Sequence, residues 1–312
     1  MKKIKFSTGN LLTKLFVSFC TFSTFISLQA QIEFKDPLEL PKSDKYTIQK
    51  VMCKSIEGKN IYGIAYIPNG ERDTKYPTVI FSHGYSSSHM FHYRYGCALA
   101  ENGIACYCFD FCGGSNISKS DGKTTDMSVL TEKRELEAVL ITAKTWQFTD
   151  TSNIFLCGES QGGFVTALTA VDHEKEIKGL VLLYPAFHIP DAMRAKFPIK
   201  DSIKNVMDFP FNMKVGRCYV DAVYDMDAFA VTKNFNKRVL IIHGDCDRAV
   251  NVSYAERAAK SYPFADLKII KGADHGFAVK EYKDLAIKYM SEFLQKESSL
   301  KSTTFSSILG QQ

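Results

Sequence analysis

The sequence has little excess charge of either sign once residues 1–30 are set aside. Among its 312 residues, 39 are basic and 34 are acidic. Four of the lysines lie in residues 1–30, which contain no acidic residue, so the rest of the chain carries 35 basic against 34 acidic side chains. A nearly neutral protein offers no basic surface for a nucleic acid. We therefore expect no nucleic-acid partner.

The sequence also lacks internal repeats, and no cysteine pair has metal-ligand spacing with histidines nearby, which argues against zinc. Cysteines themselves are numerous. An exported protein could pair some of them, and the pairing cannot be read from sequence. Three of them, Cys106, Cys108 and Cys157, lie in apolar runs typical of buried thiols. Eight cysteines follow residue 30: Cys53, Cys97, Cys106, Cys108, Cys112, Cys157, Cys218 and Cys246.

Residues 1–30 have the pattern of a signal peptide for export. Residues 2–5 contain three lysines, residues 15–28 are mostly apolar, and residues 28–30 fit a cleavage site that leaves Gln31 first. The apolar stretch is short for a transmembrane span, so we expect no stable membrane insertion after cleavage. Lipid attachment at Cys20 is a further alternative, but the preceding Phe19 is bulky where such signals have a small residue.

Apolar runs alternate with helical patterns through most of the remaining chain, which predicts a mostly parallel eight-stranded α/β sheet flanked by helices. The first two runs read as an antiparallel hairpin. The expected strands are 46–54, 60–68, 76–81, 104–111, 153–157, 179–184, 238–243 and 267–270. The expected helices are 95–102, 126–146, one that begins near Gly163, and 278–295. The predicted domain is 31–297, followed by a flexible tail at 298–312.

The segment from about 185 to 236 interrupts this alternation. It has no clear strand pattern and is rich in aromatic residues. An insertion of that kind after a central strand predicts a helical cap over a site. The alternative is that its rings form a second small core.

The motif Gly158-Glu159-Ser160-Gln161-Gly162 stands between an apolar strand pattern and a helix of small residues. A Gly-x-Ser-x-Gly sequence in that context predicts a nucleophile elbow, a tight turn that presents the serine above the sheet. An ordinary strand-to-helix turn is the alternative. The helix N-terminus would face the developing negative charge.

An activated serine needs a base, and the base needs an acid that orients it. Of the seven histidines, His275 lies in a polar, glycine-flanked turn between the last strand and the last helix. Two acids, Asp245 and Asp247, follow the preceding strand. The first can cap its own turn, whereas Asp247 projects further, so we predict Ser160, Asp247 and His275 as nucleophile, acid and base.

An oxyanion hole needs two backbone N–H groups. Gln161, which follows the nucleophile, supplies one. The second is predicted at Tyr85, after the strand 76–81, where Gly84 allows the backbone to approach.

With these residues in place, the chain resembles the α/β-hydrolase superfamily and, within it, cinnamoyl (feruloyl) esterase-like serine hydrolases. The resemblance spans roughly residues 50–295, although related esterases usually have His where this chain has Glu159. The matching stretches are His83-Gly84-Tyr85, Ser120-Asp121-Gly122-Lys123, Gly158 to Gly163, Tyr184-Pro185-Ala186, His243 to Val250 and Asp274-His275-Gly276.

This resemblance implies a cap that closes over an aromatic acyl group. Asp191 matches a cap carboxylate that contacts a phenolic hydroxyl in such esterases, and Tyr219 assists it. Phe187 and Phe211 would stack on the acyl ring. A helix cap after Pro190 is the alternative role for Asp191.

The expected function is therefore an exported serine esterase that acts on small-molecule or carbohydrate-linked esters without a metal or organic cofactor. A peptidase or an acylglycerol lipase on the same fold is the second hypothesis. A catalytically silent binding protein is the third, against which the complete set of three predicted catalytic residues argues. The oligomeric state cannot be read from the sequence.

Overall fold

The computed structural model describes residues 37–39, 43–230 and 232–306, with side chains up to residue 298. The described residues belong to one compact unit. The predicted signal peptide at 1–30, Cys20 within it, and the last part of the predicted tail lie outside the described residues. In the described part of the chain, no helix has the length and apolar character needed to cross a membrane.

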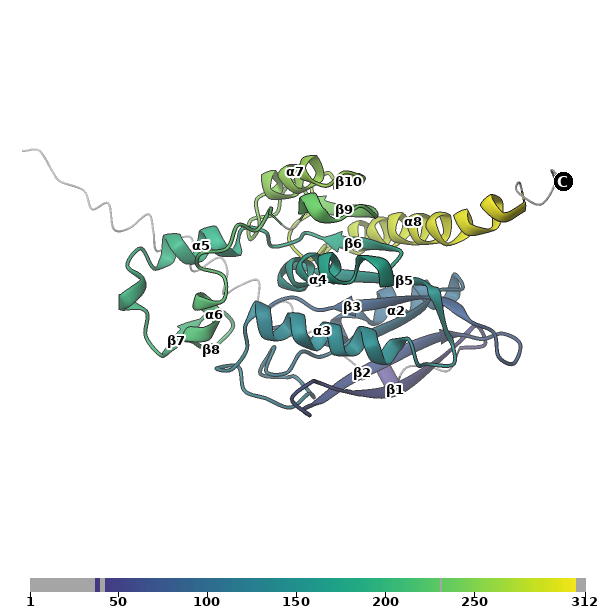
Figure 1. The fold of residues 1–312 in the computed structure, drawn as a ribbon, viewed down its shortest axis with the longest axis horizontal. Helices are drawn as coiled ribbons and strands as arrows, with labels where there is room; N and C mark the ends of the chain where they lie inside the picture. The colour runs from purple at the N-terminus through teal and green to yellow at the C-terminus, as the bar shows by residue number, and fades with distance from the viewer. Residues whose placement is uncertain (1–36, 40–42, 231, 307–312) are drawn as a thin grey trace, which may run out of the picture. The chain divides into compact units, whose positions relative to one another are not determined.

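The core of the fold is an eight-stranded, mostly parallel sheet, as predicted (Figure 1). The strand order is β1-β2-β4-β3-β5-β6-β9-β10. Only the pairs β1–β2 and β2–β4 are antiparallel in this sheet. The strands are β1 (Tyr46–Lys54), β2 (Asn60–Pro68), β3 (Tyr76–Ser82), β4 (Ala105–Phe109), β5 (Thr149–Glu159), β6 (Gly179–Leu183), β9 (Arg238–Gly244) and β10 (Ala265–Ile270).

Helices cover both faces of the sheet (Figure 1). One apolar core contains residues of α3, α4 and α7, and the other contains residues of α2 and α8. These helices are α2 (Tyr93–Glu101), α3 (Val129–Ala143), α4 (Ser160–Asp172), α7 (Val252–Ser261) and α8 (Lys280–Ser306). Short 3-10 turns are η1 (Pro37–Glu39), η2 (His89–His92) and η3 (Glu174–Glu176).

The central strands are continuous apolar runs because both of their faces are buried. In β5, Ile154 and Leu156 face the core with α3 and α4, whereas Phe155 and Cys157 face the core with α2 and α8. All four side chains are fully buried. This alternation of side chains between two apolar layers explains why the sequence pattern of these strands lacks polar positions.

The insertion between β6 and β9 forms a cap, but the expectation that it contains no strand is wrong. It includes an antiparallel hairpin, and its turn places Phe211 and Asn212 at positive φ values of 63° and 55°. Phe rarely adopts such a conformation, so the position of Phe211 lacks the Gly or Asn that marks a hairpin turn in a sequence. The cap elements are α5 (Ile189–Lys196), η4 (Lys200–Ser202), β7 (Val206–Phe209), β8 (Met213–Gly216), α6 (Arg217–Asp221) and η5 (Thr232–Asn234).

Other differences from the predicted elements are limited. The helix α7 was not predicted; Asn251 caps it by accepting a hydrogen bond from the Ser253 N–H. The helix α8 continues to Ser306, beyond the expected end at Gln295. The helix α3 is shorter than the predicted 126–146, because Ser128 and Thr131 form a capping box at its start.

The cysteines in the described residues are all free thiols. Cys106, Cys108 and Cys157 are buried, as predicted, while Cys218 and Cys246 are exposed. The Cys106 and Cys108 thiols form no disulfide, and their Sγ atoms lie within hydrogen-bond distance of each other, 3.7 Å apart.

The helix α3 carries a buried carboxylate, Glu135, that supports the loop after β4. Its side chain accepts a hydrogen bond from the Cys112 N–H at 2.8 Å, and the residue is 3% exposed. Burial raises the pKa of Glu135 to about 7, although the Cys112 N–H and Lys59 oppose this shift. Ionisation of Glu135 is therefore disfavoured in the folded state more than in the unfolded chain.

Replacing Glu135 by Gln should remove the contribution that this carboxyl group makes to the pH dependence of the unfolding free energy. The folded pKa is raised, so the stabilising effect of the neutral group is complete below about pH 4.3 and is lost as the pH rises to about 7. We expect the unfolding free energy of wild type minus that of Glu135→Gln to fall by about 3 kcal/mol across this window. Urea unfolding at several pH values measures it.

The exposed Glu256 on α7 gives a matched control. The pH-dependent change for Glu135→Gln should exceed that for Glu256→Gln. Equal changes for the two variants would contradict the raised pKa of Glu135.

Candidate active site

The turn between β5 and α4 carries Ser160 at a positive φ of 49°. Its glycines are required by the close approach of neighbouring backbone. A Cβ at Gly162 would lie 2.3 Å from the His83 carbonyl oxygen and 2.4 Å from that of Ser82, and a Cβ at Gly158 would lie 2.3 Å from the Gly162 carbonyl oxygen. Because no side chain fits, the strand and the helix meet tightly and the serine takes the strained position.

The structure brings together the three side chains predicted as nucleophile, base and acid. His275 Nε2 lies 3.1 Å from Ser160 Oγ, and His275 Nδ1 lies 2.7 Å from Asp247 Oδ2. Ser160 and His275 are partly exposed, whereas Asp247 is 8% exposed. The serine can therefore meet a substrate while its orienting acid is shielded from water.

Asp247 is held ionised by its hydrogen bonds. Its Oδ1 accepts the N–H groups of Ala249 and Val250, each at 2.8 Å. Burial alone would raise the pKa of Asp247, but hydrogen bonds from His243, His275 and the Val250 N–H outweigh it and hold the pKa well below its usual range. The acid is thus a fixed negative charge beside the imidazole.

The other acid of this loop, Asp245, has a different role. Its Oδ1 accepts the Gly272 N–H at 2.6 Å, which ties the loop after β9 to the loop after β10. It therefore holds backbone in place, as predicted, although across two loops and not within its own turn.

Two buried histidines support the loops around the site. His83 Nε2 accepts the Phe111 N–H at 2.9 Å, and His243 Nε2 lies 2.9 Å from the Val250 carbonyl oxygen. Both histidines thus hold loop backbone in place beside the site.

The proposed oxyanion donors lie on the segments that flank Ser160. Gln161 is the second residue of α4, and Gly84, which precedes Tyr85, passes so close that its Cβ would lie 3.1 Å from Ser160 Cβ. The backbone after β3 therefore borders the nucleophile, where the second donor is expected.

The side chain of Gln161 has a role that sequence reasoning missed. It is 1% exposed; its Nε2 donates to Glu132 Oε2 at 2.8 Å, and its Oε1 accepts from the Tyr219 hydroxyl at 2.7 Å. Burial raises the pKa of Glu132 well above its usual range, against the hydrogen bond from Gln161. Gln161 thus connects α3 to the cap beside the nucleophile.

Of the predicted cap residues, Tyr219 and Phe211 lie in one aromatic group with Tyr85. The Tyr85 ring centroid is 6.0 Å from that of Tyr219 and 6.3 Å from that of Phe211. Phe211 is 48% exposed, so a ligand could reach it. This group joins the cap to the segment of the predicted oxyanion donor.

The other predicted aromatic, Phe187, does not face solvent. It is fully buried, stacks on Phe229 with ring centroids 5.3 Å apart, and contacts Phe164 at 5.6 Å. Its ring faces are thus covered by the protein, and the expected stacking on a substrate is not available in this conformation. The alternative, that some cap rings form a core, applies to this residue.

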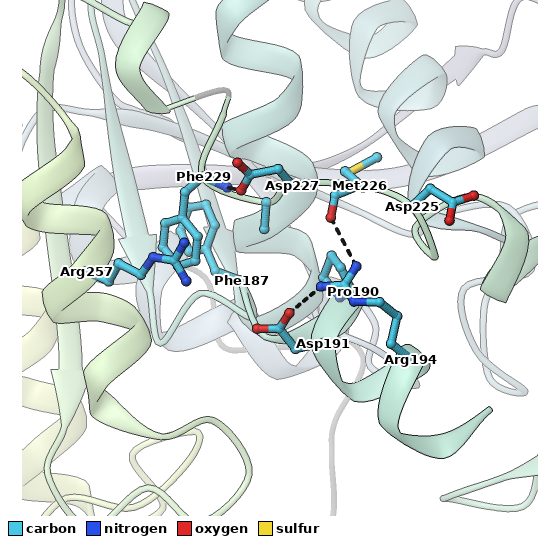
Figure 2. A pocket seen from close by; sticks show the side chains of 10 residues that line it. Phe187, Pro190, Asp191, Arg194, Asp225, Met226, Asp227, Phe229 and Arg257 are labelled. Atoms are coloured by element: carbon cyan, nitrogen blue, oxygen red, sulfur yellow. Dashed lines mark hydrogen bonds and ion pairs between the residues drawn. The ribbon is translucent and has the colours of Figure 1, made fainter. Parts of the chain in front are cut away.

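Figure 2 shows Asp191 on α5, beside a cavity of about 290 Å³. One of its oxygens pairs with Arg194, and the other accepts a hydrogen bond from the Tyr254 hydroxyl at 2.9 Å. Asp191 lies in the first turn of α5, whose N-cap residue is His188. The lining of this cavity does not include Ser160 or His275. It consists of Phe187, Pro190, Asp191, Arg194, Asp225, Met226, Asp227, Ala228, Phe229 and Arg257.

Within residues 37–39, 43–230 and 232–306, no group of three or more His, Cys, Asp or Glu side chains is arranged to hold a metal ion. The chemistry that the site can perform with its own groups is nucleophilic attack by Ser160, assisted by proton transfer to His275.

Comparison with known proteins agrees with this geometry. A family model described as serine aminopeptidase, S33, matches residues 74–215. No curated protein sequence matches the chain. Est1E from Butyrivibrio proteoclasticus with ferulic acid bound has a TM-score of 0.72 and 26% identity, over 80% of this chain and 99% of that one. An esterase from Pyrococcus furiosus has a TM-score of 0.59 and 20% identity, over 80% and 93%.

The chain has the α/β-hydrolase fold. It resembles the feruloyl esterase-like members of that fold, as the match to Est1E with ferulic acid bound indicates. A second Est1E structure has the same fold, with a TM-score of 0.69 and 24% identity over 80% of the chain. The hydrolase family model and the esterase-like neighbours together support an ester hydrolase.

The turn at Ser160 in this hydrolase gives a direct steric prediction. Gly162→Ala should destabilise the fold by about 1–3 kcal/mol and lower activity, because the new Cβ meets two backbone carbonyls that side-chain motion cannot relieve. Thermal unfolding and ester hydrolysis measure the two effects. Gly70→Ala is the control, because its Cβ would meet only side-chain atoms of Tyr76 and Thr74. Wild-type stability and activity in Gly162→Ala would contradict the steric argument.

Proposed function

We propose that this protein is a serine esterase that cleaves carboxylic esters through an acyl-enzyme. The observation that carries the proposal is the pair of contacts that His275 makes, with Ser160 Oγ at 3.1 Å and with Asp247 Oδ2 at 2.7 Å. A serine, an imidazole and a buried carboxylate in this order are the groups that acyl transfer requires.

In the first half of the reaction, Ser160 Oγ attacks the ester carbonyl carbon while His275 Nε2 takes the hydroxyl proton. Asp247 accepts the Nδ1–H hydrogen bond and stabilises the imidazolium that forms. The backbone N–H groups of Tyr85 and Gln161 stabilise the negative charge on the carbonyl oxygen. The alcohol then leaves with the proton from His275, and the acyl group stays on Ser160.

In the second half, water takes the place of the alcohol. His275 removes a proton from water, which attacks the acyl carbonyl, and the same two N–H groups stabilise the second tetrahedral intermediate. Its collapse returns the proton to Ser160 Oγ and releases the carboxylic acid. The chain's own residues supply every proton transfer in this sequence.

The acyl group that we propose is aromatic, of the hydroxycinnamoyl type. The similarity to Est1E, which was solved with ferulic acid bound, supports this class. The partly exposed Tyr85 ring and the half-exposed Phe211 ring support it as well, since such rings bind planar acyl groups by stacking, and the buried Tyr219 packs against Tyr85. The alcohol part would be a small molecule or a carbohydrate, and export through residues 1–30 would bring the enzyme to such esters outside the cytoplasm.

An aminopeptidase is the second candidate, because the family model that matches residues 74–215 carries that description. Faster hydrolysis of aminoacyl amides than of hydroxycinnamate esters by the purified protein would favour it. A preference for long-chain glycerides would favour a lipase instead. Failure of a fluorophosphonate to label Ser160 in folded protein would favour a binding protein without catalytic activity.

The two aspartates of the loop after β9 provide a matched test of the mechanism. Asp247→Asn should lower kcat for a nitrophenyl ester by roughly 10³–10⁴-fold, because the imidazole loses its orienting charge. Asp245→Asn, two positions away, keeps the side-chain oxygen that accepts the Gly272 N–H and should stay within a few-fold of wild type. Ser160→Ala should lose activity and fluorophosphonate labelling together. Hydrolysis by Ser160→Ala at the wild-type rate would refute the serine mechanism.

We also propose that Asp191 contacts the phenolic hydroxyl of the acyl group, as it already accepts a phenolic hydrogen bond from Tyr254. Asp191→Ala should then lower kcat/KM for ferulate esters about tenfold to hundredfold, which corresponds to about 1.5–3 kcal/mol, and should barely affect acetate esters.

Asp225→Ala is the control for this test, because Asp225 lines the same cavity and pairs with Lys200. It should leave the ratio of ferulate to acetate activity unchanged. Equal losses of kcat/KM on both esters in Asp191→Ala would show that Asp191 stabilises the cap through Arg194 and Tyr254 and does not bind the phenolic hydroxyl.

A further inference from the structure

A second ionised carboxylate lies beside the nucleophile. Glu159 is the last residue of β5, directly before Ser160, and its side chain is 13% exposed. Burial would raise the pKa of Glu159, but His92, the Tyr184 hydroxyl and the Gly84 N–H together hold the pKa well below its usual range. The proposed mechanism gives this charge no step.

Glu159 Oε1 contacts the segment that follows β3. It accepts the Gly84 N–H at 3.3 Å and the Ser87 hydroxyl at 3.3 Å, and it lies 3.0 Å from His92 Nε2. Gly84 precedes Tyr85, whose N–H is the proposed second oxyanion donor. The carboxylate therefore fixes the backbone from which that donor projects.

Glu159 Oε2 contacts the other side of the site. It accepts the Tyr184 hydroxyl at 2.6 Å. The Tyr184 ring meets the His275 ring edge to face, with centroids 4.7 Å apart and an interplanar angle of 62°. Tyr184 has a positive φ of 36°, which is costly for a bulky residue and is retained only where surrounding contacts hold it. The hydrogen bond to Glu159 is such a contact.

From these contacts we propose that Glu159 is a positioning residue, which aligns the oxyanion donor of Tyr85 through Gly84 and the imidazole of His275 through Tyr184. One carboxylate thereby sets the distance between the two groups that act on the substrate carbonyl. A carboxylate suits this position because its two oxygens accept from both sides at once. Its contact with His92 lies on the side of Oε1, away from Tyr184.

This inference rests on the proposed serine mechanism, so the test uses ratios to a wild-type enzyme that hydrolyses a nitrophenyl ester. Glu159→Gln keeps the size and one acceptor oxygen but loses the charge. Tyr184→Phe keeps the ring on His275 but loses the hydrogen bond to Glu159. Each should lower kcat about tenfold to hundredfold and leave KM within a few-fold, since the alignment of reacting groups changes and the binding surface does not.

The double variant distinguishes positioning from two separate effects. If Glu159 acts on His275 through Tyr184, the loss in Glu159→Gln/Tyr184→Phe should be clearly smaller than the product of the two single losses. The rate of fluorophosphonate labelling should fall in parallel with kcat, because the reagent needs the same alignment but no acyl pocket. Tyr262→Phe is the control, because its buried hydroxyl has no hydrogen-bond partner in the described part of the chain.

Three results would overturn the proposal. The first is a wild-type kcat in both Glu159→Gln and Tyr184→Phe, and the second is a change in KM without a change in kcat. The third is a kcat loss in the double variant equal to the product of the two single losses. If Glu159→Gln does not fold, Tyr184→Phe decides by itself, with wild-type kcat and labelling rate counting against the proposal. An inactive wild type that also resists fluorophosphonate would instead refute the esterase function, so the two failures are distinguishable.

Discussion

The close approach of backbone to backbone at the turn after β5 is the constraint on which the site depends. Gly162 lies against the carbonyls of Ser82 and His83, so α4 and the end of β3 meet without side chains between them. This contact brings the segment after β3 within reach of Ser160. The loops after β9 and β10 meet at the same edge of the sheet because these neighbouring strands are parallel, and they bring Asp247 and His275 to the serine.

Buried carboxylates around this turn fall into two electrostatic classes. Asp247 and Glu159 receive hydrogen bonds from several donors, and these bonds outweigh the cost of burial, so both stay charged. Glu132 and Glu135 on α3 have fewer donors, and burial raises their pKa values. The number of hydrogen-bond donors around each carboxylate therefore determines which of these buried groups near Ser160 is negatively charged.

The sequence was sufficient for the features that depend on local pattern. Strands buried on both faces need continuous apolar runs, and the turn at Ser160 needs its glycines, so the sheet and the positions of Ser160 and His275 were predictable. Asp247 could be preferred to Asp245 because it lies further from the strand end. The hairpin β7–β8 was missed because Phe211 stands where a turn usually has Gly or Asn.

The features that could not be predicted are hydrogen bonds between residues far apart in the chain. Glu159 and Gly84 are separated by 75 positions, and Gln161 and Tyr219 by 58, so no local spacing marks either pair. Aromatic content also failed to tell which rings face a ligand: Phe187 is buried against Phe229, whereas Phe211 is half exposed. The physical reason is that orientation within a cap depends on its tertiary packing.

The hydrogen bond between Tyr219 and Gln161 makes the cap and the nucleophile turn thermodynamically linked. Any displacement of α6 that breaks it leaves a buried amide oxygen without its donor, at a cost of about 1–3 kcal/mol. A ligand contact that holds α6 in place therefore also protects the Gln161 side chain, which lies next to Ser160, and the reverse holds as well. The position of α6 and the turn at Ser160 are therefore coupled energetically through this one buried hydrogen bond.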